Sequence, residues 1–255
     1  MLTLKLLIDM RIFSLKAPSL ILILGLLLSS CAGCDEDPLQ NKLLVFLDMT
    51  DPTMFHQVRD DASEALKKLS KSFFRVVEYE GGSLRIVRVR DNCQNKPLFS
   101  SSYAPLPAGV SPFGVLPNDY QLFLKSMKQF QLDSAASGYT KTCLYEPLCN
   151  ELIELTKTVF PKKGKIELLI YSDMLENNGK DSTSLYKNKS LDSETFEARL
   201  VSQYKLELPS LEGVKIHIIN HRNVKNDDII RYSGLLWKEM FERHGATVSG
   251  PKATF

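Results

Sequence analysis

The chain has 255 residues, of which 44% are hydrophobic and 24% are charged, the composition of an ordinary globular protein. Its 32 Lys and Arg residues nearly balance its 30 Asp and Glu residues, which gives a formal net charge of +2. This composition excludes collagen-like, wholly disordered and multi-span membrane proteins. Because basic residues are not in excess, the charge argues against a nucleic-acid partner.

The first 30 residues have the pattern of a secretory signal. A basic start precedes an apolar run at positions 20–28, which is too short to cross about 30 Å of hydrocarbon as a helix. The sequence LSSC at positions 28–31 then resembles the lipobox of bacterial lipoproteins. By that resemblance the signal is cut before Cys31, whose thiol carries a diacylglycerol and whose new amine is acylated. A start at Met10 would give a signal of more usual length.

The lipobox resemblance implies a lipid anchor and a place in the bacterial cell envelope, with the domain in the periplasm or outside the cell. Cys34 is the weaker lipid acceptor because the residue three positions before it is not aliphatic. An uncleaved N-terminal anchor and a signal cut by the ordinary peptidase are the alternatives. Ala32 occupies the place of the aspartate that retains lipoproteins in some enteric bacteria, which favours the outer membrane. We expect a signal peptide at 1–30 and a lipidated tether at 31–40.

Three apolar runs after the tether are typical of buried parallel strands, and they cover residues 43–47, 166–171 and 214–219. Apolar residues at helical spacing predict helices within 58–69, 120–130, 148–159, 196–204 and 230–241. Alternating strands and helices indicate a doubly wound α/β domain with a mostly parallel, Rossmann-like sheet. We place this domain at 41–248, followed by a C-terminal tail at 249–255.

One edge of the sheet is predicted to carry an antiparallel hairpin. Residues 75–80 and 84–89 read as two strands separated by Gly81 and Gly82. The following segment, 92–118, is rich in Pro and Ser and lacks periodicity, so it is expected to be a long surface loop.

Three cysteines beyond the tether are disulfide candidates, because an exported domain of this size can hold disulfides. Cys34 lies in the acidic tether and is expected to stay outside the fold. Cys143 and Cys149 are six residues apart, a rise of about 9 Å on one helix, beyond the limit of about 7 Å between bridged Cα atoms. They could pair only if Cys143 precedes the helix. The preferred bridge joins Cys93 to either Cys143 or Cys149.

Acidic residues follow two of the predicted strands. Asp48 and Asp51 come after the first strand, and Asp173 comes after a later one. Ligands of open α/β sheets bind at the carboxyl ends of the strands, so these side chains are expected at one edge. Clustered carboxylates repel one another, and a cation relieves that repulsion. Oxygen ligands from Asp and Thr suit Mg²⁺, Ca²⁺ or Mn²⁺ rather than zinc.

This arrangement resembles the von Willebrand factor A family, whose doubly wound domain carries a metal-ion-dependent adhesion site. Asp48 and Thr50 match the first two positions of its Asp-x-Ser-x-Ser motif, whereas Pro52 replaces the last hydroxyl. Thr142 matches a threonine that precedes a helix, and Asp173 matches an aspartate after the middle strand. The cation site that the resemblance implies consists of Asp48, Thr50, Asp51, Thr142 and Asp173.

The resemblance implies that an envelope protein docks at this edge, with a partner carboxylate completing the shell of the cation. Thr140 is the alternative to Thr142. Asp51 and Pro52 would also begin a helix without any metal. A metal-assisted hydrolase of the phosphoesterase type and a metal-free structural component of the envelope are the alternative functions. His217 lies in an apolar strand and is expected to have a hydrogen-bond partner there.

Overall fold

In the computed structural model, the residues that are described lie in the unit Leu39–Phe255. The described residues are 41–48, 68, 72–73, 81–89, 93, 96–105, 118, 121–122, 125, 142–157, 164–176, 190–220 and 227–252. The helices predicted within 58–69 and 120–130 therefore lie mostly outside the described residues.

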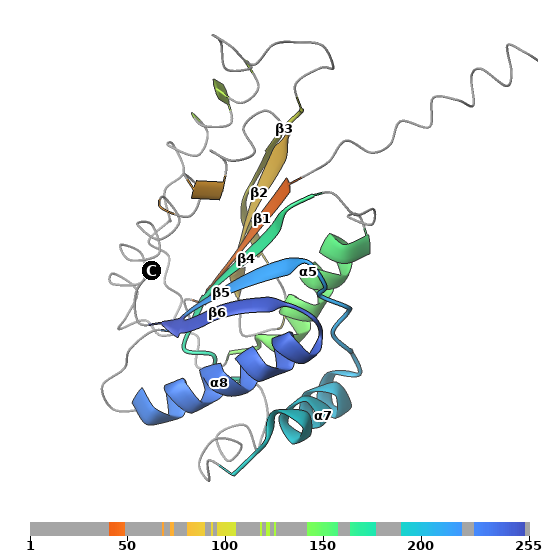
Figure 1. The fold of residues 1–255 in the computed structure, drawn as a ribbon, viewed down its shortest axis with the longest axis vertical. Coiled ribbons are helices and arrows are strands. Elements are labelled where there is room, and N and C mark those ends of the chain that lie inside the picture. The colour runs from red at the N-terminus through yellow and green to blue at the C-terminus, as the bar shows by residue number, and fades with distance from the viewer. Residues whose placement is uncertain are drawn as a thin grey trace, which may run out of the picture. The chain divides into compact units, whose positions relative to one another are not determined.

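A six-stranded sheet in the order β3-β2-β1-β4-β5-β6 forms the centre of this unit (Figure 1). Its strands are β1 (Asn41–Asp48), β2 (Gly82–Val89), β3 (Lys96–Tyr103), β4 (Ile166–Ser172), β5 (Val214–Asn220) and β6 (Thr247–Lys252). All neighbouring strands pair in parallel except β2 and β3, which are antiparallel. The predicted α/β class, with a mostly parallel sheet and an antiparallel edge pair, is confirmed.

Both faces of the central strands are buried. The consecutive side chains Leu43 to Leu47 of β1 are each at most 2% exposed, and all seven residues of β4 are buried. Successive side chains of a strand point to opposite faces, so only a strand covered on both sides buries such a continuous run. This explains why the apolar runs identified the central strands directly.

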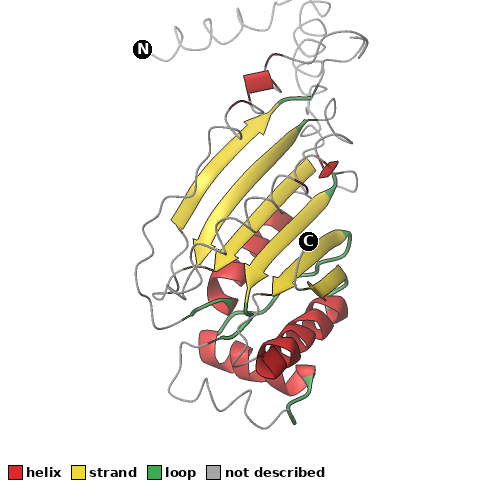
Figure 2. Ribbon diagram, turned by 90° about the vertical axis from the view of Figure 1, so that its left-hand side faces the viewer, coloured by secondary structure: helices red, strands yellow, loops and turns green. Residues whose placement is uncertain are grey.

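Three described helices pack against one face of the sheet (Figures 1 and 2). They are α5 (Tyr145–Lys157), α7 (Ser193–Tyr204) and α8 (Asp227–Arg243). The ring of Trp237 on α8 lies 5.7 Å from that of Phe196 on α7 and 6.1 Å from that of Tyr145 on α5. Asp192 caps α7, and its side chain accepts a hydrogen bond from the Thr195 amide at 2.6 Å. None of the described helices is long and apolar enough to cross a membrane.

The structure corrects the predicted hairpin. β2 lies between β1 and β3, and residues 75–80, the predicted partner, lie outside the described residues. The antiparallel partner is instead β3, inside the segment 92–118 that was predicted to be a loop. This strand was missed because Pro97 and three successive serines remove its apolar alternation, and an edge strand tolerates both.

The C-terminal end of the chain is also corrected. Residues 247–252 form β6, which pairs in parallel with β5. The segment 249–255 is therefore no simple tail, because its first four residues belong to the sheet. The pair Gly250-Pro251 hid this strand, since both residue types are rare inside strands.

Candidate binding site at the carboxyl edge of the sheet

Asp48 and Ser172 meet at the carboxyl edge, where β1 and β4 end. The two strands pair in parallel up to Leu47 and Tyr171, which brings the next residue of each strand to the same level. The Ser172 hydroxyl donates a hydrogen bond of 2.8 Å to Oδ2 of Asp48, whose residue is only 5% exposed. This contact joins two positions that lie 124 residues apart in the sequence.

Asp173 follows directly, in the turn that leaves β4. Its Oδ1 accepts a hydrogen bond of 2.9 Å from the Leu175 amide, while Ser172 Oγ accepts one of 2.8 Å from the Met174 amide. Met174 has a φ of 61°, so its backbone is in the left-handed region. The turn keeps both polar side chains at the end of the strand, next to the end of β1.

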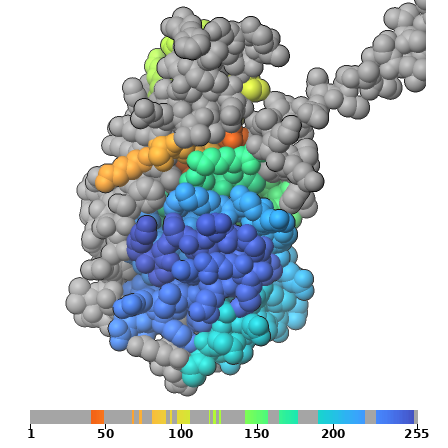
Figure 3. Space-filling model, in the orientation of Figure 1, coloured from red at the N-terminus to blue at the C-terminus, as the bar shows by residue number. Residues whose placement is uncertain are grey.

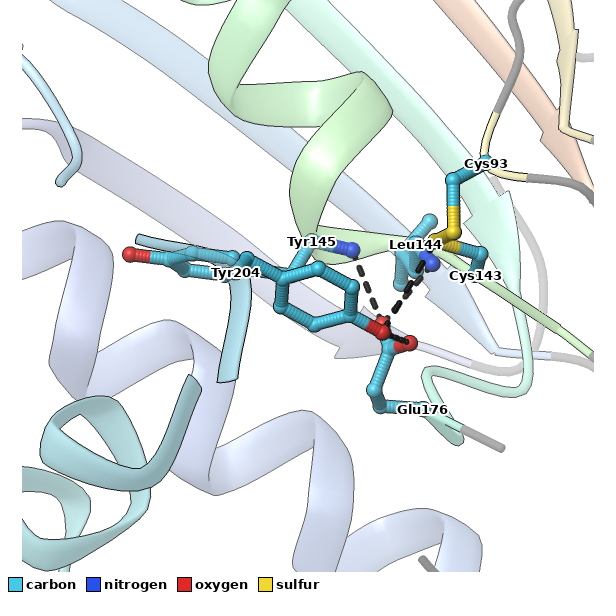
Figure 4. Close-up of a disulfide and its surroundings, with 6 residues drawn as sticks. All are labelled: Cys93, Cys143, Leu144, Tyr145, Glu176 and Tyr204. Atoms are coloured by element: carbon cyan, nitrogen blue, oxygen red, sulfur yellow. Dashed lines mark hydrogen bonds between the residues drawn. A yellow bond between two sulfur atoms is a disulfide. The ribbon is translucent and has the colours of Figure 1, made fainter. Parts of the chain in front are cut away.

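A third carboxylate, which the sequence analysis did not select, lies three residues further along. Glu176 is 1% exposed, and its Oε2 accepts hydrogen bonds of 2.8 Å from the amides of both Leu144 and Tyr145 at the start of α5 (Figure 4). Its Oε1 accepts a short hydrogen bond from the Tyr204 hydroxyl of α7. A carboxylate from another part of the chain thus caps this helix, whose N-terminal amides favour negative charge.

The pKa of Glu176 is raised to about 7. Burial is the largest cause, because it disfavours the charged carboxylate. The bonds from Tyr204, Tyr145 and Leu144 lower the pKa, and the nearby negative charge of Asp48 raises it. Asp48 and Glu176 therefore repel each other at this edge, which is the kind of repulsion that a bound cation relieves.

Thr142 lies immediately before the segment that binds Glu176, and it is 6% exposed. The next residue, Cys143, forms a disulfide with Cys93, which follows β2 (Figure 4). This bridge is one of the two preferred pairings of the sequence analysis. Cys149 is a buried thiol in α5, and burial raises its pKa to about 12.

The described part of the predicted cation site has oxygen donors only. Asp48, Thr142 and Asp173 offer carboxylate and hydroxyl oxygens, which fits a hard cation such as Mg²⁺. The other two expected ligands, Thr50 and Asp51, lie outside the described residues, as does the lipid-acceptor cysteine, Cys31.

One group in the described part brings three metal-type ligand atoms within 4.8 Å of one another. It consists of Cys93, Cys143 and Glu146. The two sulfur atoms are bonded to each other, so neither is available as a thiolate ligand. This cluster is therefore a disulfide beside a glutamate rather than a metal centre.

No family model and no curated protein matches the chain. One similar solved structure is the ArnB paralog VWA2 from Sulfolobus acidocaldarius, which is 14% identical with a TM-score of 0.42. The match covers 82% of this chain and 41% of VWA2. An aerotolerance-related membrane protein from Bacteroides fragilis is 8% identical with a TM-score of 0.38, covering 84% of this chain and 92% of its own.

Proximal thread matrix protein 1 from the mussel byssus, in a structure with a zinc-occupied MIDAS motif, is 12% identical with a TM-score of 0.42. The match covers 83% of this chain and 44% of the mussel protein. The chain thus spans less than half the length of VWA2 and of the mussel protein. These likenesses concern the fold alone and carry no argument about function.

Proposed function

We propose that this chain is a lipid-anchored protein of the bacterial cell envelope, whose α/β domain binds a protein partner at the carboxyl edge of β1 and β4. The contact between Ser172 Oγ and Asp48 Oδ2 carries the proposal, because it joins the acidic ends of two adjacent strands at the edge where such sheets bind ligands. The anchor rests on the resemblance of residues 28–31 to a lipobox.

A divalent cation, Mg²⁺ before Ca²⁺ or Mn²⁺, is part of this proposal. Asp48, Thr142 and Asp173 would hold it, together with Thr50 and Asp51. When bound, the cation supplies a coordination position that a carboxylate of the partner completes. Pro52 is the main departure from the von Willebrand A motif, since it leaves the shell one hydroxyl ligand short.

The surroundings support a preformed site. The disulfide at Cys143 and the Glu176 bonds to Leu144 and Tyr145 fix the chain that follows Thr142. Ser172 fixes Asp48 in the same way from β4. Groups held before binding lose little conformational entropy when a ligand arrives, which favours affinity.

Thermal unfolding in Mg²⁺ or Mn²⁺ tests the cation site. A ligand present at 100 times its Kd stabilises the native protein by about 2.7 kcal/mol, so the midpoint should rise with metal concentration. Asp173→Asn should abolish this rise, whereas Glu194→Gln, an exposed acid of α7, should keep it. A midpoint of thermal unfolding that neither metal changes would contradict the cation site. The docking surface would then be tested separately.

Capture from envelope membranes tests the docking surface. Immobilised wild-type domain should retain one defined envelope protein in Mg²⁺ and release it in EDTA. The Asp48→Asn and Asp173→Asn variants should not retain it, and Glu194→Gln should. Retention that is equal for all four proteins would show that the partner, if any, docks elsewhere.

Labelling of cells with radioactive palmitate tests the anchor. The chain should take up label, and Cys31→Ala should lose it. Cys34→Ala is the matched control, because this cysteine lies three residues away, and it should stay labelled. Label that persists in Cys31→Ala and disappears in Cys34→Ala would show that Cys34 carries the lipid. A wild-type chain without label would contradict the lipid anchor.

A further inference from the structure

A second group of polar side chains lies on three adjacent strands, β4, β5 and β6. Glu167 is on β4, His217 on β5 and Ser249 on β6. His217 and Ser249 are direct partners in the pairing of β5 with β6, and His217 faces Leu169, two residues from Glu167. The three side chains therefore point to the same face of adjacent strands.

Hydrogen bonds link the three side chains in a line. Ser249 Oγ lies 2.8 Å from Nδ1 of His217, and Nε2 of the same ring lies 2.9 Å from Oε2 of Glu167. An ionised carboxylate can only accept hydrogen bonds, so Nε2 of the neutral ring carries its proton. Nδ1, at 2.8 Å, is then a nearer acceptor for the Ser249 hydroxyl than the Ile216 carbonyl oxygen at 3.5 Å, which is the relation of a general base to a nucleophile.

The charge of Glu167 is fixed by its surroundings. Burial alone would raise its pKa, but hydrogen bonds from His217 and Lys165 bring the pKa down to about 2. Lys165 Nζ lies 2.8 Å from Oε1, so each carboxylate oxygen has its own cationic or N–H partner. Glu167 thereby holds the tautomer and the orientation of the ring, the role of the third member of a catalytic triad.

The serine is the accessible end of this line. Glu167 and His217 are 3% and 9% exposed, whereas Ser249 is only half-buried on an edge strand. The last described residues of the chain, dark blue in Figure 3, form part of the surface in that view. Ser249 is thus the least buried of the three residues.

The backbone beside the serine is distorted. The pairing of β5 with β6 shifts register between His217 and Ile219, and the facing residue Gly250 has a φ of 111°. A Cβ at Gly250 would lie 2.3 Å from the Ile218 carbonyl oxygen. Bulges of this kind re-aim neighbouring side chains and occur often beside active sites.

We propose that Ser249, His217 and Glu167 form a catalytic triad for acyl transfer from small carboxylic esters. Ser249 Oγ bonds to the ester carbonyl carbon while its proton passes to His217 Nδ1. The leaving alkoxide takes that proton as the ester C–O bond breaks. Water then attacks the acyl-serine with His217 as base, which releases the acid and restores the hydroxyl.

The roles of the two ring nitrogens are exchanged relative to the serine-protease triad, in which Nε2 faces the serine. Glu167 remains ionised throughout and stabilises the imidazolium. The reaction uses no cation, so the proposed activity and the proposed cation site at the carboxyl edge can be tested independently of each other.

A fluorophosphonate probe tests the proposal on the folded wild-type protein. Ser249 Oγ should displace fluoride from phosphorus, and mass spectrometry of the digested protein should place the adduct on Ser249. His217→Gln should slow labelling by at least about 100-fold, the contribution of a positioned general base. Ser101→Ala, on the opposite edge strand β3, should label like the wild type.

Hydrolysis of p-nitrophenyl acetate provides the second readout. Ser249→Ala should lose the activity, with its thermal midpoint checked to show that it is folded. Glu167→Gln should lower the rate at least 10-fold by releasing the ring from its orientation. Native wild-type protein that leaves Ser249 unlabelled, or labelling that His217→Gln does not slow, would overturn the proposal and reduce the three residues to a structural network.

Discussion

Glu176 shows how strongly a single side chain depends on the fold around it. Its carboxylate is buried between the start of α5 and the Tyr204 hydroxyl, close to the charge of Asp48. Burial and that charge oppose ionisation, while the hydrogen bonds favour it, and burial prevails. The native protein therefore holds on to this proton to about pH 7, whereas an exposed glutamate releases it near pH 4.5.

The pH dependence of stability should report this proton. Because the folded pKa of about 7 lies above the ordinary 4.5, the contribution of Glu176 is complete below pH 4.5 and is lost as the pH rises to about 7. The loss should approach about 3 kcal/mol at 1.36 kcal/mol per pKa unit. Urea unfolding of wild type and Glu176→Gln between pH 4.5 and 8 measures it.

Glu176→Gln keeps an oxygen that can accept from the Leu144 and Tyr145 amides, and it carries no titrating group. The variant should therefore show a flatter dependence of the free energy of unfolding on pH in this window. Parallel curves for the two proteins would contradict the assignment.

Residues differ in how far the sequence predicted them. Asp48 and Asp173 were placed at the carboxyl edge because they follow apolar strands, and His217 was expected to have a hydrogen-bond partner, as it does. Glu176 carried no such signal, since it lies beyond the strand in a polar segment. Its role arises from α5 and α7, which no local pattern connects to it.

Two elements depend on contacts that the chain makes over long distances. The disulfide ties the chain after β2 to the start of α5, closing a loop between positions 50 residues apart. Strand β6 depends instead on Gly250, because the Ile218 carbonyl oxygen leaves no room for a side chain at this position.

Loss of the disulfide should destabilise the domain. Cross-linking a loop of this size restricts the unfolded chain, and removing such a bridge costs about 2–5 kcal/mol. The double variant Cys93→Ser/Cys143→Ser should lower the free energy of unfolding in urea by that amount. Cys34→Ser, in the segment that is expected to be the tether, should leave the free energy of unfolding unchanged, and equal stability of both variants would contradict a structural bridge.

A pair of glycine variants should separate steric clash from backbone strain. Gly250→Ala combines a φ of 111° with the 2.3 Å approach to Ile218, whereas Gly213→Ala has a φ of 81° and no heavy atom within 4 Å. Gly213→Ala should cost only the left-handed backbone penalty, about 1–2 kcal/mol. Gly250→Ala should cost clearly more in thermal unfolding, and equal costs would contradict the tight pairing of β6.

At the scale of the whole molecule, the sequence predicted the centre of the sheet and missed its edges. The central strands β1, β4 and β5 bury nearly every side chain, so their apolar runs were unambiguous. The edge strands β3 and β6 contain Pro97, Gly250 and Pro251 and keep many residues partly exposed. Their strand character comes from pairing with a neighbour, which composition does not reveal.

The same difference applies to the candidate sites. The cation site at the carboxyl edge follows from topology, because parallel strands bring their ends together and acidic residues follow them. The line of Ser249, His217 and Glu167 required the position of β6 beside β5, which the sequence analysis had assigned in part to a tail. A correct sheet order was therefore necessary before this second site could be recognised.

Anomalous diffraction from a crystal of the domain soaked in Mn²⁺ tests the cation site at the carboxyl edge. We expect an anomalous peak at the carboxyl edge, coordinated by Asp48 and Asp173, and its loss in Asp173→Asn crystals grown under the same conditions. A soaked wild-type crystal that shows both carboxylates well ordered and no peak between them would contradict the cation site.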